Sequence, residues 1–234
     1  DTNNAFKPLP FSFERNSIGT RVNKEGLIEV VGNDIPRIDY TDSTEGALLL
    51  ENSATNLVTY SEAFDNAYWI KPQTSVVSGQ ASPSGDTNAF KLVEDTSNNL
   101  HWLLQPTVLN TSGTLSYSIF AKAGERDYIS MGNASGALYS FFDLQNGTVV
   151  SSVANAVGSI ESFSNGWYRC TVKLTTTGAQ AIGVFISTDG STINYQGNGT
   201  SGVYIYGAML ESNSVASSYI PTNGSTVQRA AETC

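Results

Sequence analysis

The sequence predicts an all-β fold, a sandwich of antiparallel strands, from three observations. Apolar and polar residues alternate with a period of two through most of the chain after about residue 86, as half-buried strands do. Short turns rich in Gly, Asn, Ser and Asp separate the alternating segments, and no helical period intervenes. Only 14% of the 234 residues are charged and 21 are Gly, a composition typical of many strands and turns. Together these observations favour a β-sandwich of jelly-roll type.

The first 60 residues differ in pattern from the rest of the chain. Segments 21–40 and 46–57 indicate two short strand pairs, which need partners because an isolated hairpin is marginal in water. The C-terminal segment can supply them. We therefore expect residues 1–60 and 212–234 to pair as peripheral strands of a single domain that spans residues 1–234.

Later segments show the alternation clearly. In residues 113–123, Leu115, Tyr117 and Ile119 share one face and polar residues share the other, which predicts a half-buried strand. Residues 167–174 alternate in the same way. Further strands are predicted within 127–131, 137–144, 180–188 and 203–210.

Two cysteines permit one disulfide bond without requiring it. Cys170 alternates with apolar residues on a predicted strand, and Cys234 is the last residue printed. A buried free thiol at Cys170 is the simpler expectation, and no metal–thiolate site is expected.

The charge balance excludes two classes of partner. A formal net charge of −9 and a pI near 4.5 argue against nonspecific binding to nucleic acid or to an anionic membrane, because both need clustered Lys and Arg. No run of apolar residues is long enough to predict a membrane-spanning helix. Residues 1–20 lack the basic start and apolar core of a signal peptide, as expected of a mature secreted protein or an excised domain.

Catalytic residues are not indicated. The one histidine, His101, shares its predicted strand face with Leu103 and Gln105 and has no carboxylate there, so a catalytic triad has no support. Two-carboxylate glycoside hydrolysis needs only a pair of Asp or Glu on facing strands, and the carboxylates here stand ungrouped at strand ends and turns. We therefore expect a protein that is not an enzyme.

The stretch "NNLHWLLQPT" at 98–107 offers two alternative ligand faces. In the simplest interpretation, Trp102 enters the core and His101 and Gln105 form a polar pair on the opposite face. A β-bulge or a slip of one residue would reverse this and expose Trp102 as a stacking platform. A histidine satisfied by backbone on an unused face is the plainer alternative.

Sugar recognition needs flat aromatic faces together with planar polar groups. Arg126 and Tyr128 share a predicted strand face, Tyr139 lies on the next strand, and Trp69 stands near a predicted loop. An Arg beside a Tyr suits a sugar that carries carboxylate or sulfate, through bidentate hydrogen bonds. The plainer alternatives are a solvated Arg126 and a Trp69 that anchors the core.

The order of several motifs resembles a known family. "RVNKEGLIEVV", "ALLLENSATNLVTYSEAFDNAYWIK", "SIFAKAGER", "NGWYRCTV", "YIYGAMLE" and "SSYIPTNGSTVQRAAE" run in the order found in concanavalin-like or CBM4-like jelly-roll carbohydrate-binding modules, a family that also resembles receptor-binding domains of phage fibres. The resemblance covers residues 20–232. The family often has Trp-Gly-Ala-Gln where "YGAM" stands here, so a ligand role for Met209 is unsupported.

The resemblance implies a non-catalytic carbohydrate-binding module that targets an attached polysaccharide-degrading enzyme to its polysaccharide, often a marine algal one. Such a module is a secreted, lectin-like monomer that needs no cofactor. Similar modules often hold a structural calcium ion, for which Glu62, Asp65 and Glu211 are the hard-oxygen candidates. Two alternatives stay open: a phage-type fibre or adhesin receptor-binding domain, and a glycoside hydrolase or polysaccharide lyase.

Overall fold

The computed structural model describes residues 12–109, 112–133, 137–178 and 180–234. Within these residues it contains β-strands, one short 3-10 turn, η1 (Ser164–Gly166), and no α-helix. The prediction of an all-β antiparallel fold is confirmed. No helix in the described part of the chain is long and apolar enough to cross a bilayer.

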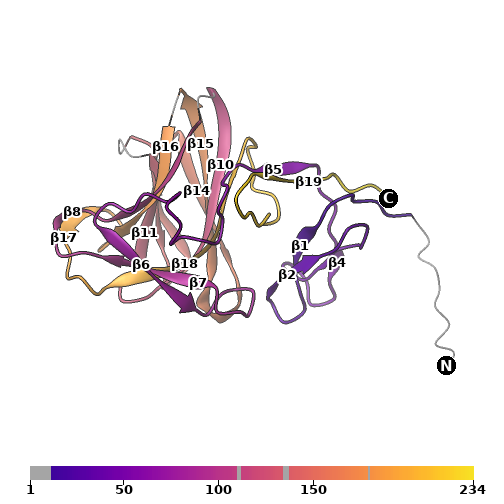
Figure 1. Cartoon of the computed structure of the whole chain (residues 1–234), viewed down its shortest axis with the longest axis horizontal. Coiled ribbons are helices and arrows are strands. Elements are labelled where there is room, and N and C mark those ends of the chain that lie inside the picture. The colour runs from indigo at the N-terminus through magenta and orange to yellow at the C-terminus, as the bar shows by residue number, and fades with distance from the viewer. Residues whose placement is uncertain (1–11, 110–111, 134–136, 179) are drawn as a thin grey trace.

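Two antiparallel sheets form the sandwich (Figure 1). One has six strands in the order β14-β15-β10-β18-β7-β6, and the other has five in the order β13-β12-β11-β16-β9. The six-stranded sheet comprises β6 (Thr74–Gln80), β7 (Ala89–Glu94), β10 (Ser112–Lys122), β14 (Ala156–Ser162), β15 (Tyr168–Thr177) and β18 (Gly202–Glu211). The five-stranded sheet comprises β9 (Trp102–Leu109), β11 (Tyr128–Asn133), β12 (Tyr139–Asp143), β13 (Thr148–Ser152) and β16 (Gln180–Ser187).

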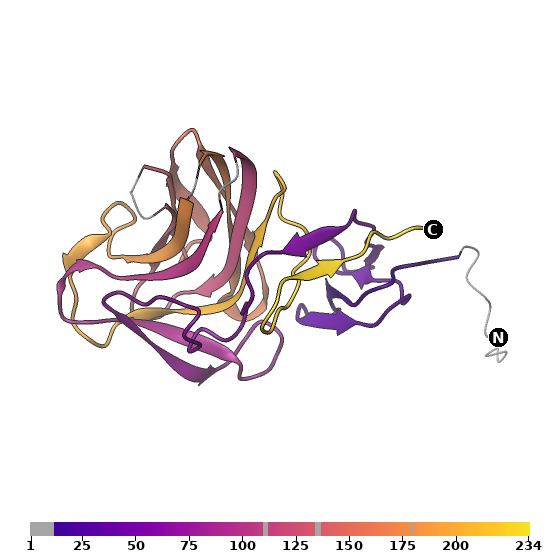
Figure 2. The same ribbon diagram turned by 45° about the horizontal axis from the view of Figure 1, so that its top comes forward.

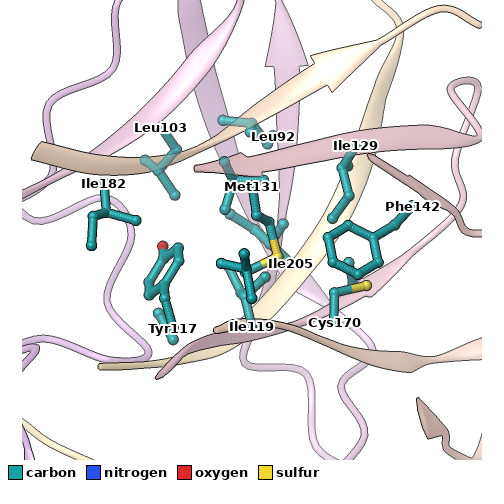
Figure 3. Close-up of a cluster of buried hydrophobic side chains, with 14 of the residues drawn as sticks. Leu92, Leu103, Tyr117, Ile119, Ile129, Met131, Phe142, Cys170, Ile182 and Ile205 are labelled. Atoms are coloured by element: carbon teal, nitrogen blue, oxygen red, sulfur yellow. The ribbon is translucent and has the colours of Figure 1, made fainter. Parts of the chain in front are cut away.

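The main core lies between the two sheets (Figure 3). Leu115, Tyr117 and Ile119 of β10 point into it, as their alternation predicts, and each is at most 2% exposed. From the facing sheet, Met131 of β11 and Phe142 of β12 pack against them (Figure 3). Alternation is reliable here because both sheets press their inner faces on one apolar layer.

A smaller group of strands lies beside the sandwich (Figure 1). We call residues 12–56 together with 213–234 the peripheral unit. Its N-terminal and C-terminal parts pair with each other: β19 runs antiparallel to β5, and Glu14 forms an isolated bridge with Thr233. Its strands are β1 (Gly19–Val22), β2 (Ile28–Val31), β3 (Ile38–Asp39), β4 (Ala47–Leu48), β5 (Ala54–Asn56) and β19 (Val227–Arg229).

The peripheral unit covers the outer face of the six-stranded sheet. A second apolar cluster joins Ile28 and Tyr219 of the unit to Phe120, Trp167 and Met209 of the sandwich region. Phe120 and Trp167 are each 1% exposed, although alternation alone would place them on an outward face. The six-stranded sheet is therefore buried on both sides over this area.

A buried charge network ties the unit together. Glu232 accepts hydrogen bonds from Arg15 Nη1 at 2.8 Å and from Arg37 Nε at 2.6 Å, and Arg37 also donates to Glu51 at 2.8 Å. Arg229 lies 3.4 Å from the same Glu51 carboxylate. The side chains of the three arginines and of Glu232 are fully buried. The network thus joins segments that lie some 200 residues apart in sequence.

Both cysteines are free: Cys170 is buried in the main core and Cys234 is exposed. Burial raises the pKa of the Cys170 thiol far above its usual value, so its reactive thiolate form is scarce. Treating the native protein with a thiol reagent at pH 8 is expected to modify Cys234 alone, and modification of both is expected in denaturant. Mass spectrometry of the alkylated protein checks this, and rapid native labelling of Cys170 would contradict the packing described.

Candidate functional site

The outer face of the five-stranded sheet carries a row of aromatic side chains. Phe141 of β12 lies opposite Ser130 of β11, Ser130 lies opposite Phe185 of β16, and Phe185 lies opposite Trp102 of β9. Their neighbours Phe142, Ile129, Met131, Val184, Ile186 and Leu103 belong to the main core. Because side chains alternate along a strand, the row faces away from the core. We call this surface the aromatic face.

At the β9 end of the row, the rings of Trp102 and Phe185 form a flat platform. The rings of Trp102 and Phe185 stack at 5.0 Å with planes 7° apart, and Trp102 is half-buried, which leaves part of the indole open to solvent. Phe185 beneath it is only 2% exposed. The indole is thus held against a fixed ring, which lowers the conformational entropy it would lose on binding a ligand.

Two glycines lie on the same sheet face beside this platform. Gly183 lies beside Phe185, and a Cβ atom built there would stand 2.6 Å from the Leu103 carbonyl oxygen and 3.3 Å from the Trp102 ring. Gly132 on the neighbouring strand lies opposite both Gly183 and Tyr139. Neither glycine carries a side chain, and neighbouring backbone approaches both positions closely.

Two of the predicted ligand residues lie on this face. Tyr139 is half-buried and contacts Phe141 with ring centroids 5.4 Å apart and planes at 72°. Tyr128 lies opposite Asp143 in the adjoining row. The negative charge of Asp143 disfavours the phenolate form of Tyr128 and so raises the pKa of its hydroxyl. Tyr128, Tyr139 and Trp102 are therefore brought together on one sheet face, with polar groups at its edge.

The outward polar pair predicted at His101 and Gln105 is wrong. Both residues are 0% exposed. His101 Nε2 lies 3.2 Å from Asp95 Oδ1 with its ring 4.7 Å from that of Tyr195, and Gln105 Nε2 donates to the Tyr68 hydroxyl at 3.1 Å. The alternative left open, an outward Trp102, is the arrangement found.

The grouping by alternation holds and only its direction is reversed: His101, Leu103 and Gln105 are buried, whereas Leu100, Trp102 and Leu104 are partly exposed. The stretch that the sequence suggests as one strand is two: β8 (Asn98–Leu100) pairs with β17 (Asn194–Gln196), and β9 pairs with β16. His101 sits at the break between them, where its ring fits against Gly197, at which a Cβ would stand 2.8 Å from Nε2. The core side of this stretch therefore carries a histidine and a glutamine, which polarity alone assigns to the outer face.

Arg126 is not available to a ligand in the way predicted. Its Nε and Nη2 atoms donate to the two carboxylate oxygens of Glu94 at 2.9 and 2.6 Å, and its guanidinium lies 5.3 Å from the ring centroid of Tyr195. Burial alone would raise the pKa of Glu94, but bonds from Arg126, Tyr195 and Asn198 outweigh it and hold that pKa below its usual value. This bidentate pair is a structural element.

Trp69 is a core anchor. It is 2% exposed, its ring packs 5.1 Å from Phe64, and its indole N–H donates to the Tyr60 carbonyl at 2.9 Å. The predicted ligand contact at Trp69 is therefore wrong, and the plainer alternative describes it.

The three calcium candidates do not meet. Glu62 and Asp65 line one shallow hollow, whereas Glu211 is 1% exposed and accepts hydrogen bonds from the backbone and hydroxyl of Ser217 at 2.9 and 2.8 Å. Glu62 accepts from the hydroxyls of Tyr206 and Tyr219. Within the described ranges, no three His, Cys, Asp or Glu side chains are grouped so as to hold a metal ion.

Phe141 and Phe185, which are not among the predicted ligand residues, complete the row. They are 5% and 2% exposed and contact the rings of Tyr139 and Trp102. The parity of "SFFDL" and "GVFIS" does put one aromatic of each outward, opposite the apolar residues that enter the core. What could not be read from sequence is the register that aligns them across four strands. In comparisons with known proteins, no protein-family model matches this chain, and no curated protein matches it significantly.

Proposed function

We propose that this protein is a non-catalytic carbohydrate-binding module whose ligand lies along the aromatic face. The observation that carries the proposal is the partly exposed Trp102, whose ring stacks nearly parallel to that of Phe185 at one end of the aromatic row. A pyranose ring has an apolar C–H side that stacks on such a surface, and its hydroxyls need polar groups nearby. The hydroxyls of the half-buried Tyr128 and Tyr139 supply polar groups on this face.

The wider setting of the proposal comes from the family resemblance of the motifs. On this proposal, the module acts outside the cell as a monomer. It is joined to a polysaccharide-degrading enzyme and holds that enzyme on a polysaccharide, such as one from marine algae. Tethering of this kind raises the local concentration of the substrate without any chemistry by the module itself. No cofactor takes part.

Replacing Trp102 by alanine is expected to weaken binding to the best polysaccharide by about tenfold or more, because the stacking surface is removed. Affinity gel electrophoresis through agarose, laminarin, xylan and alginate first identifies that polysaccharide for the wild-type protein. Retardation of the Trp102→Ala variant in the same gel, compared across polysaccharide concentrations, then gives the change in dissociation constant.

Tyr40→Ala is the matched control, since Tyr40 is a half-buried aromatic of the peripheral unit, far from the aromatic face. Its retardation is expected to equal that of the wild type. Equal retardation of the wild type and the Trp102→Ala variant on every retarding gel would place the ligand elsewhere. Absence of retardation of the wild type on all gels would count against carbohydrate binding.

The two rival functions give different results in solution. A fibre or adhesin domain is expected to form a stable trimer in light scattering, whereas the proposed module is expected to run as a monomer. A hydrolase or lyase would release reducing ends or unsaturated products from the retarding polysaccharide, and sustained turnover by the pure chain would replace the proposal.

A further inference from the structure

A second site, apart from the aromatic face, is indicated by Arg169. This residue lies on the outer face of β15, and only 8% of its surface is exposed. Nε and Nη2 donate to the Ser118 hydroxyl at 3.3 and 3.1 Å, Nη2 contacts the Met209 sulfur at 3.8 Å, and the guanidinium carbon lies 5.6 Å from the Phe120 ring centroid. None of these neighbours carries a charge.

Arg169 differs from the other arginines in having no carboxylate in direct contact among the described residues. Arg15, Arg21, Arg37, Arg126 and Arg229 each have a carboxylate oxygen within 4 Å. In the part of the chain that the structure describes, no carboxylate lies within that distance of Arg169, and no bond to its Nη1 atom is found. Burial lowers the pKa of Arg169, the negative charges of Glu211, Glu161 and Glu51 offset this in part, and an arginine remains protonated in proteins. A buried cation without a direct counter-ion is costly unless a partner arrives.

The guanidinium forms part of the wall of a cleft. The cleft has a volume of about 200 Å³ and lies between the six-stranded sheet and the peripheral unit. Phe120 and Phe163 give it an apolar wall, and its lining also carries Arg21 and the carboxylates of Asp39, Asp42, Glu51 and Glu161. A second hollow along β14 and β15 shares Glu161, Arg169 and Ala216 with it, so the two are continuous at Arg169.

We propose that this cleft binds the carboxylate of a uronic acid, as a single sugar or as one residue of an acidic polysaccharide, through the Arg169 guanidinium. The carboxylate accepts hydrogen bonds from Nη1 and Nη2, the geometry that guanidinium and carboxylate share. The apolar wall at Phe163 faces the C–H side of the sugar ring.

The acidic lining selects this ligand over a simple anion. Asp42 and Glu161 have no hydrogen-bond partner within the described residues, so their oxygens are free to accept bonds from ligand hydroxyls. Inorganic sulfate brings two negative charges and no hydrogen-bond donor, so the same carboxylates repel it more strongly than they repel a monoanionic uronate. A uronic acid offers one carboxylate for the arginine and several hydroxyls for the acids.

The test is titration of the isotope-labelled protein with sodium D-glucuronate and sodium D-galacturonate, followed by NMR. The side-chain Nε–H signal of Arg169 reports binding directly and is expected to shift with at least one of the two sugars. The methyl ester of that sugar, which lacks the charge, is expected to bind about tenfold more weakly. Equal affinity for the ester or for sulfate would overturn the proposal.

Three variants separate the cleft from other sites. Glu161→Gln keeps an acceptor but removes a negative charge beside the ligand, so binding is expected to tighten by about threefold. Glu45→Gln, an exposed acid outside the cleft, serves as its matched control and is expected to change nothing. Ala216→Phe fills the cleft from a partly exposed position and is expected to abolish binding.

Arg169→Met is expected to abolish binding as well, and Ala216→Phe gives the answer if the methionine variant does not fold. Unchanged affinity in both Glu161→Gln and Ala216→Phe would refute the site. Because Trp102→Ala leaves the cleft intact, it is expected to bind the uronate normally. Failure of the uronate titration and failure of polysaccharide binding on the aromatic face are therefore separate results.

Discussion

Replacing Glu232 by glutamine is expected to lower the free energy of unfolding of the peripheral unit by about 3 to 5 kcal/mol, because it breaks a buried charge pair from one side. The carboxylate accepts bonds from Arg15, from two nitrogens of Arg37 and from the Glu51 amide. An amide supplies one acceptor oxygen and no charge, which leaves Arg15 without a carboxylate partner among the described residues and leaves Glu51 as the one carboxylate in contact with Arg37 and Arg229. Urea unfolding combined with hydrogen exchange of residues 12–56 measures the loss.

Glu29→Gln is the matched control. Glu29 pairs with Arg21 at 2.9 Å, but its side chain is 44% exposed, so the expected change is within about 1 kcal/mol. Equal, small effects of both substitutions would mean that the network adds nothing to the unit beyond an exposed pair.

The same network sets a dependence on pH. Burial alone would raise the pKa of Glu232, but bonds to Arg37 and Arg15 outweigh it and hold the pKa below its usual value of 4.5. A carboxyl with a lowered folded-state pKa stabilises the fold above the unfolded value, and that contribution disappears as pH falls through the folded value. The wild type is therefore expected to lose stability below about pH 4.5 more steeply than Glu232→Gln.

Replacing Trp69 by alanine is expected to cost about 3 to 5 kcal/mol of global stability, the usual range for a large aromatic removed from a core. Its indole fills space against Phe64 and Tyr68 and satisfies the Tyr60 carbonyl. Thermal unfolding and urea unfolding measure the loss. The folded fraction of the variant is expected to bind polysaccharide with unchanged affinity, since Trp69 does not reach the aromatic face.

Trp102→Ala provides the opposite pattern. The Trp102 ring is half-buried on the sheet surface, so the stability of this variant is expected to fall by less than that of Trp69→Ala, while its binding weakens by about tenfold or more. A Trp69→Ala variant that stayed as stable as the wild type would contradict the packing, and one that folded but lost binding would restore Trp69 as a ligand residue.

Alternation predicted the inner faces of the sandwich well, because they meet an apolar layer that every strand must satisfy. Leu115, Tyr117 and Ile119 are buried in the main core as expected, and Cys170 is the buried free thiol expected of its strand. Alternation did not predict the burial of the polar side of the same strands. Arg169 and Ser118 are expected to face solvent from the sequence pattern, but they lie beneath the peripheral unit. Local pattern does not report that a distant segment folds back over a sheet.

The candidate site shows the same division. An aromatic strand face was foreseeable from residues such as Tyr139, whereas the outward direction of Trp102 was not, because the core side of its strand carries the polar His101 and Gln105. These two side chains contact Asp95 and Tyr68, and alternation does not report such partners. The aromatic row itself depends on register across four strands, and register is a property of the assembled sheet.

The layered arrangement has a practical consequence for how the protein can be handled. Three layers follow one another: the peripheral unit, the six-stranded sheet and the five-stranded sheet, whose outer surface is the aromatic face (Figure 2). Cys234 lies in the first layer and is the one exposed cysteine, both cysteines being within the described residues. Coupling the protein to a sensor chip through this thiol would orient every molecule alike, with Trp102 directed toward the solution.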